Sequence, residues 1–106
     1  MYRDEYERCP RCNLELVDAG AGRGCTQCQG VFIPEPVLRE MANDMPTPAA
    51  PVTLAWEVEQ RARLKCPSCT ELMEAVLLNR IPIDRCTAHG VWFDRGELGA
   101  VLLAYA

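Results

Sequence analysis

The sequence has little positive charge, a single lysine, a single histidine and no long apolar run. Its 106 residues hold 11 Lys and Arg against 15 Asp and Glu, which gives a formal net charge of −4. Nonspecific nucleic-acid binding depends on neutralising phosphates with Lys and Arg, so the overall charge argues against it. No segment approaches the roughly 18 consecutive apolar residues of a membrane span.

The N-terminal segment, residues 1–8, is charged and lacks the apolar stretch of a secretory signal. We therefore expect an intracellular, cytoplasmic protein. In a reducing compartment the seven cysteines favour metal binding over disulfides. Seven thiols cannot all pair within one chain, whereas seven thiols and the one histidine make two sets of four.

The chain contains two copies of one pattern, in which two ligand pairs flank a spacer and precede a glycine and three apolar residues. The first copy runs through Cys9-Pro10-Arg11-Cys12, residues 13–24, Cys25-Thr26-Gln27-Cys28 and Gly30-Val31-Phe32-Ile33. The second copy runs through Cys66-Pro67-Ser68-Cys69, residues 70–85, Cys86-Thr87-Ala88-His89 and Gly90-Val91-Trp92-Phe93. The spacing predicts two sites that follow one another along the chain.

A Cys-x-x-Cys turn lets two thiolates converge on one tetrahedral zinc ion, and two such turns joined by a hairpin complete the tetrahedron. We therefore expect two structural Zn²⁺ ions. Their predicted ligands are Cys9, Cys12, Cys25 and Cys28 for the first, and Cys66, Cys69, Cys86 and His89 for the second. Iron is the main alternative for the first set, because four thiolates also suit it. Structural disulfides and a thioredoxin-like redox pair are weaker alternatives, the latter because no βαβ context is visible.

The predicted fold class is a small metal-stabilised α+β protein. Each copy is expected to form a zinc ribbon (knuckle, β-hairpin, knuckle) followed by a short C-terminal helix. The predicted parts are ribbon 1 with its helix over residues 1–43, a proline-rich linker over residues 44–52, and ribbon 2 over residues 53–106. The first hairpin strands are expected at residues 14–17 and 72–77, with a turn at residues 79–84 in the second copy. Because each ribbon is too small for a core alone to suffice, we expect folding to require zinc.

Three further segments carry helix signals. Residues 53–65 fit a short helix that becomes extended by Leu64, although Leu54, Trp56 and Val58 also alternate as in a strand. We favour the helix there. The first C-terminal helix is expected over residues 35–43, with a proline in its first turn and Leu38 and Met41 buried.

The last helix, from residue 95 to about residue 105, is expected to open with a capping box of Asp94 and Glu97. An apolar stripe follows, made of Leu98, Val101, Leu102 and Tyr105. Such a stripe is typical of a helix packed on a core. A partner-binding helix is the alternative.

Residues 66–98 resemble the bacterial zf-TFIIB-type transcription factor zinc-finger family. The likeness is carried by Cys66-Pro67-Ser68-Cys69, by Ile83-Asp84-Arg85-Cys86, and by the run from Gly90 to Leu98. His89-Gly90 departs from the family's Cys-Gly-Gly, and the first copy lacks the D-x-G-E-L part. The resemblance implies a tandem zinc ribbon with a terminal helix and implies little about activity.

If all eight residues bind metal, no thiol nucleophile and no imidazole base remain, so we expect no enzyme and no catalytic residue. The predicted function is a structural zinc-binding adaptor that contacts another protein, with no membrane association. The alternative is a nucleic-acid-binding or transcription- or translation-associated factor, and a zinc-release redox switch is a further one. Contacts to nucleic acid would come from the local basic residues Arg61, Arg63, Lys65, Arg80 and Arg85.

Overall fold

The computed structural model describes residues 7–45 and 52–105, within which seven strands and two helices form. The first copy holds β1 (Val17–Asp18), β2 (Arg23–Gly24), β3 (Val31–Ile33) and α1 (Glu35–Asn43). The second holds β4 (Trp56–Val58), β5 (Glu74–Leu78), β6 (Ile81–Cys86), β7 (Gly90–Phe93) and α2 (Glu97–Leu103). Most of the predicted linker, residues 46–51, lies outside the described residues. The architecture is the predicted small α+β class, with a hairpin between the ligand pairs of each copy.

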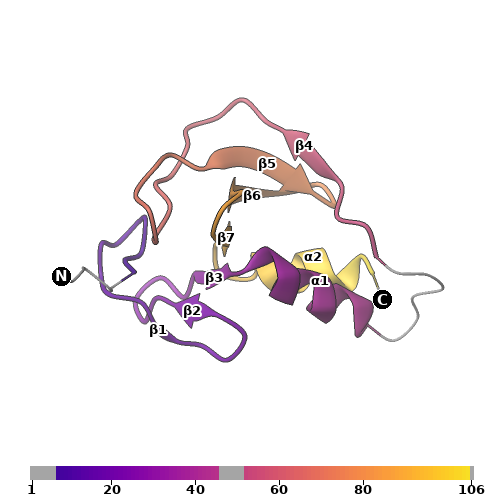
Figure 1. Ribbon diagram of the computed structural model, residues 1–106, viewed down its shortest axis with the longest axis horizontal. Coiled ribbons are helices and arrows are strands. Elements are labelled where there is room, and N and C mark those ends of the chain that lie inside the picture. The colour runs from indigo at the N-terminus through magenta and orange to yellow at the C-terminus, as the bar shows by residue number, and fades with distance from the viewer. Residues whose placement is uncertain (1–6, 46–51, 106) are drawn as a thin grey trace.

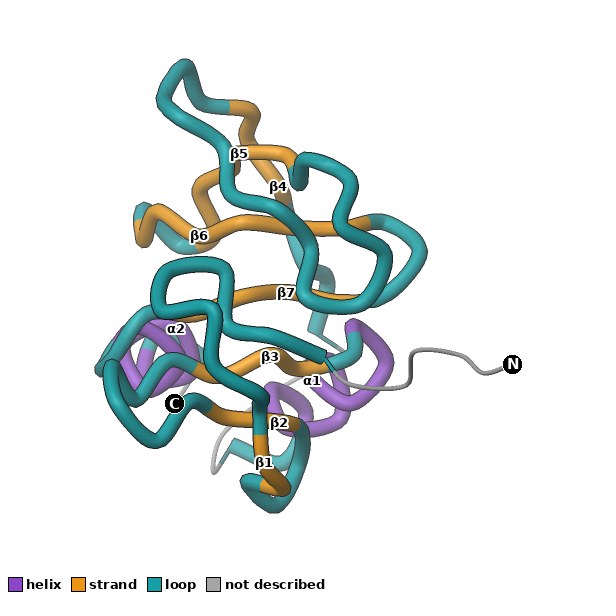
Figure 2. The backbone as a smooth tube through the Cα atoms, turned by 90° about the vertical axis from the view of Figure 1, so that its left-hand side faces the viewer, coloured by secondary structure: helices purple, strands orange, loops and turns teal. Residues whose placement is uncertain are grey.

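All seven strands belong to one antiparallel sheet with the order β1-β2-β3-β7-β6-β5-β4. Figure 2 shows the strands stacked from β5 and β4 at the top to β1 at the bottom. The two copies meet where β3 pairs with β7. The sheet therefore runs across the boundary predicted between the ribbons, and the boundaries themselves stay a prediction.

The β3–β7 pair relates the copies by an approximate twofold axis. Phe32 lies opposite Trp92, which is its counterpart in the repeat. The flanking partners exchange as a twofold requires: Val31 pairs with Phe93 and Ile33 with Val91. Each copy thus presents the same strand to the other, and the axis passes between Phe32 and Trp92.

Two clusters of buried side chains form the core. One lies beneath both helices and consists of Ile33, Leu38, Val76, Leu78, Ile83, Val91, Phe93 and Val101. The other surrounds the ligand turns and consists of Leu16, Phe32, Met73, Trp92, Cys9, Cys25 and Cys66. The two helices lie at the same end of the molecule, to the right in Figure 1. Each cluster takes residues from both copies, so neither copy has a core of its own.

The short helix favoured for residues 53–65 is wrong, because this segment contains strand β4. Trp56 pairs with Leu78 and Val58 pairs with Val76, which adds β4 to the free edge of β5. The Trp56 ring stacks under the Arg85 guanidinium, 4.6 Å from the ring centroid. The alternating pattern seen in the sequence described this segment better than the helical one, because backbone pairing with an existing strand decides the conformation here.

Helix α1 confirms its prediction. It begins at Glu35 after Pro34, and Pro36 occupies the first turn, where a missing N–H leaves no hydrogen bond unmade. Leu38 is fully buried and Met41 packs against the helix-side core. Ala42, one turn after Leu38, is buried as well.

Helix α2 begins at Glu97, two residues later than predicted, and its N-cap is Gly96 at φ 84°. Asp94 is therefore not the N-cap, and its carboxylate binds elsewhere. Half of the predicted capping box is formed, since the Asp94 N–H donates to Glu97 Oε1 at 2.9 Å. Val101 is buried, and the rest of the predicted stripe packs against the core, as in a core helix.

The second hairpin turns more tightly than predicted. Only Asn79 and Arg80 form the turn, at φ 54° and 68°, and both strands extend up to it. Two successive left-handed residues match the right-handed twist of the strands they join. The Asn79 side chain donates to the Val101 carbonyl at 3.1 Å, which ties the turn to α2. Within the described residues no helix is long and apolar enough to cross a membrane.

Candidate metal centres

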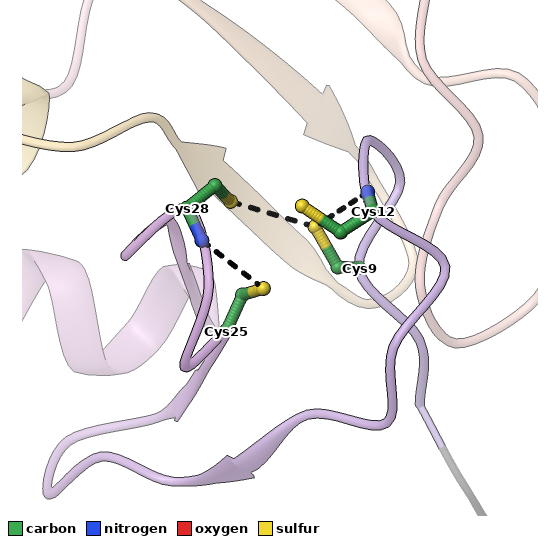
Figure 3. Close-up of side chains that lie close together, drawn as sticks. All are labelled: Cys9, Cys12, Cys25 and Cys28. Carbon is green, nitrogen blue, oxygen red and sulfur yellow. Dashed lines mark hydrogen bonds between the residues drawn. The ribbon is translucent and has the colours of Figure 1, made fainter.

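The first set of four predicted ligands converges at one point between two turns (Figure 3). The four sulfur atoms of Cys9, Cys12, Cys25 and Cys28 lie within 4.8 Å of one another. Cys9 Sγ and Cys28 Sγ, from opposite turns, are 3.6 Å apart. Thiolates bound to zinc at about 2.3 Å in a tetrahedron lie about 3.8 Å from each other. The spacing thus fits one tetrahedral ion.

The second set converges in the same way. Cys69 Sγ and Cys86 Sγ are 3.9 Å apart. The Nδ1 atom of His89 lies 3.5 Å from Cys86 Sγ and 3.9 Å from Cys66 Sγ. His89 therefore offers Nδ1 as the fourth ligand, in the place that Cys28 has in the first copy. The sites differ in exposure, because His89 is solvent-exposed whereas its counterpart Cys28 is half-buried.

Backbone N–H groups aim at the first thiol of each ligand turn. Cys9 Sγ accepts from the N–H of Arg11 at 3.4 Å and from that of Cys12 at 3.2 Å. Cys25 Sγ accepts from the Cys28 N–H at 3.5 Å. Such bonds favour the charged thiolate, which is the form that binds a metal ion.

Left-handed residues close these turns. Asn13 has φ 61°, and its N–H donates to the Cys9 carbonyl at 2.9 Å. Thr70, at φ 64°, makes the same bond to the Cys66 carbonyl at 2.9 Å. A left-handed residue after the second cysteine reverses the chain so that it leaves the site as a strand.

The thiols influence one another strongly. Burial, followed by hydrogen bonds with neighbouring thiols, raises the pKa of Cys12 to about 12, and burial raises the pKa of Cys66 to about 12. At Cys25 and Cys86 burial also acts to raise the pKa, but backbone N–H groups and the His89 imidazole, respectively, lower it to about 7. Thiols held this close cannot all ionise unless a cation neutralises them. A divalent ion that prefers sulfur and imidazole supplies that charge.

All seven cysteines are free of disulfides, and each belongs to one of the two clusters. The sequence model of a family described as transcription factor zinc-finger matches residues 65–104. The match covers the second copy, which is therefore similar to this zinc-finger family. The resemblance predicted from its motifs is therefore confirmed for that copy.

The matched zinc-finger segment contains the second ligand set and all of α2. The first copy lies outside the match, and its likeness rests on the repeat and on its own cluster of four cysteines. Searches among curated proteins and among solved structures found no match. The family match and the two clusters together give the protein two structural zinc sites, as predicted.

An ion pair that nothing in the sequence predicted joins the second copy to the first. Arg11 Nε lies 2.6 Å from Asp94 Oδ1, and Arg11 Nη2 lies 2.8 Å from Asp94 Oδ2. The Trp92 indole N–H also donates to Asp94 Oδ1, at 3.1 Å. Burial acts to raise the pKa of Asp94, but Arg11 and Trp92 outweigh it and hold the pKa below its usual value. Because Arg11 and Trp92 bind both of its oxygens, the Asp94 carboxylate does not cap α2.

A second missed contact anchors the segment before the zinc-finger's first turn. Asp84, only 3% exposed, binds Arg61 Nη1 at 3.2 Å and the Leu64 N–H at 3.4 Å. The Arg61 guanidinium also donates to the carbonyls of Val76 and Ile83.

Three of the five basic residues considered for nucleic-acid contacts are engaged within the protein. Besides Arg61, Arg63 donates to the Met73 carbonyl at 2.6 Å. Arg85 binds the Glu35 carboxylate at 3.0 Å and lies over the Trp56 ring. The other two, Lys65 and Arg80, are exposed.

Proposed function

We propose that this protein is an adaptor: a scaffold stabilised by two zinc ions that binds another protein in the cytoplasm. Its two ligand sets are complete, with four ligands each, and a four-coordinate zinc site has no open position for a substrate. The catalytic roles open to thiols and imidazole are taken by metal binding. We therefore keep the prediction that the protein is not an enzyme.

The use of its arginines is the observation that carries this proposal. The guanidinium groups of Arg61, Arg63 and Arg85 bind carbonyls and carboxylates of the same chain. The half-buried Arg61 and Arg85 are thereby withdrawn from phosphate groups, which nucleic-acid binding requires as partners of Lys and Arg, whereas Arg63 stays exposed. The net charge of −4 acts in the same direction. Nucleic-acid binding through Lys65 and Arg80 remains the alternative, favoured by the name of the matched family.

Affinity purification of the full zinc-loaded chain from its native cell tests the proposal. Mass spectrometry should identify a partner protein that stays bound after nuclease treatment. An electrophoretic shift assay with micromolar protein should show no salt-dependent complex with DNA or RNA. A nuclease-sensitive interaction alone, or a salt-dependent shift, would favour the alternative and overturn the adaptor function.

A further inference from the structure

The twofold relation between the copies creates two corresponding places on the surface. At each place, the first ligand turn of one copy faces the end of the strand, β3 or β7, through which the other copy joins the sheet. At one of them Arg11 enters from the first copy and binds Asp94, which follows β7 of the second. A guanidinium group therefore fills this place and is held by both carboxylate oxygens.

At the other place the corresponding residues are Ser68 and Pro34. Neither can make an ion pair, and a cleft of about 680 Å³ opens there, lined by both residues. Its wall includes His89 and the hairpin of the first copy. The cleft thus takes the position that an arginine of the same chain occupies on the other side of the axis.

Carboxylates dominate the charged lining of the cleft. Glu7, Glu15 and Asp18 face one guanidinium, that of Arg23, whose Nε lies 3.9 Å from Glu7. Glu15 and Asp18 are exposed to solvent. The cleft therefore favours a cation.

The lining also contains apolar surface. Its accessible part comes from the half-buried Pro34, because Leu16 and Phe32 also line the cleft but are each only 3% exposed. An arginine side chain suits such a site, since its apolar stem can lie on a hydrophobic surface while its planar fork pairs with carboxylates.

We propose that this cleft binds an arginine side chain of an extended peptide segment in a partner protein. The guanidinium takes the place that Arg11 takes on the other side of the axis and pairs with Glu15 and Asp18. The stem lies against Pro34. This inference rests on the proposed adaptor function and names the surface and the chemistry of its partner.

Fluorescence anisotropy of the full zinc-loaded chain tests the cleft directly. The probe is a labelled glycine–serine peptide with one central arginine, and its control carries the neutral isostere citrulline. The arginine peptide should bind at least tenfold more tightly. Equal binding of the two peptides, or no binding of either, would overturn the proposal.

Two sets of variants locate the binding. The double variant Ser68→Arg with Pro34→Asp copies the Arg11–Asp94 pair into the cleft and should abolish peptide binding. The variant Glu15→Gln with Asp18→Asn leaves the cleft open, lowers its charge and should weaken binding about tenfold. Glu40→Gln with Glu57→Gln, two exposed carboxylates elsewhere, is the matched control and should leave binding unchanged.

If the filled-cleft variant (Ser68→Arg with Pro34→Asp) does not fold, the affinities of Glu15→Gln with Asp18→Asn and of its control, Glu40→Gln with Glu57→Gln, decide. An equal loss of peptide affinity in these two variants would contradict binding in the cleft. The partner purified from cells separates the two proposals. A partner captured equally by the wild type and the filled-cleft variant contradicts the cleft and leaves the adaptor function standing, whereas the absence of any protein partner contradicts the adaptor function.

Discussion

Arg11 and Asp94 form a two-pronged ion pair that joins the first ligand turn of one copy to the last strand of the other. The N–O distances are 2.6 Å and 2.8 Å, across 83 positions of sequence. Together with the β3–β7 pairing, this contact makes the two ribbons one structural unit.

Arg11→Ala should lower the free energy of unfolding by about 1 kcal/mol, the upper end for a partly exposed pair, because its geometry is bidentate. The matched control is Arg39→Ala. Arg39 is equally exposed, at 47%, and meets Glu35 through a single nitrogen at 3.3 Å one helical turn away. Arg39→Ala should lower the free energy of unfolding by less than about 0.5 kcal/mol. Urea unfolding of the zinc-loaded variants measures both free energies. An equal loss in the two variants would show that the Arg11–Asp94 pair is no stronger than an ordinary surface pair.

Asp84→Ala should cost far more, about 3 kcal/mol, because it removes the buried carboxylate from the Arg61 guanidinium and leaves only the partly exposed Glu59 beside it. Glu59→Gln is the control, since Glu59 pairs with the same guanidinium at 2.7 Å but is itself one-third exposed. Glu59→Gln should lower the free energy of unfolding by less than about 1 kcal/mol. Thermal unfolding followed by circular dichroism compares the two. Similar melting temperatures would contradict the anchoring role of Asp84.

Gly30→Ala should destabilise the protein by about 1–3 kcal/mol through overpacking. A Cβ atom at this position would lie 2.2 Å from Trp92 Cζ2, on the axis between the copies. Gly99→Ala is the opposite case, because no atom lies within 4 Å of its Cβ position in α2. It should stabilise by about 0.5–1 kcal/mol, as alanine restricts the unfolded chain more than glycine. Tryptophan fluorescence during denaturant unfolding reads both changes, and a neutral Gly30→Ala would contradict the close packing.

Complete removal of zinc should unfold both copies together. The core around the ligand turns contains cysteines and apolar residues of both copies, so it cannot persist in one copy alone. Structural zinc contributes on the order of 10 kcal/mol in finger-like peptides, more than a domain of this size can spare. Chelation followed by far-UV circular dichroism checks this. A spectrum that keeps its shape without zinc would rule out a structural role for the metal.

Local features of the sequence predicted local structure well. The eight ligand positions follow from the spacing of short turns, and α1 from a proline in its first turn. Each of these depends on residues a few positions apart, where backbone sterics decide the conformation.

Contacts between distant segments account for the failures. Residues 56–58 form a strand because the edge of β5 was free to pair, and nothing inside that segment reveals this edge. Asp94 does not cap α2 because Arg11 binds its carboxylate. The pairing of β3 with β7 could not be predicted either, since an apolar strand pattern does not name its partner.

Native mass spectrometry of the full chain tests the central claim most directly, by counting zinc in the wild type and in two single-ligand variants. The structure predicts two zinc ions in the wild type, bound at two separate sets of four ligands. Cys12→Ser and Cys69→Ser should each bind one tightly held zinc fewer. A wild type with fewer than two zinc ions, iron at the four-thiolate site, or variants that keep both zinc ions would contradict it.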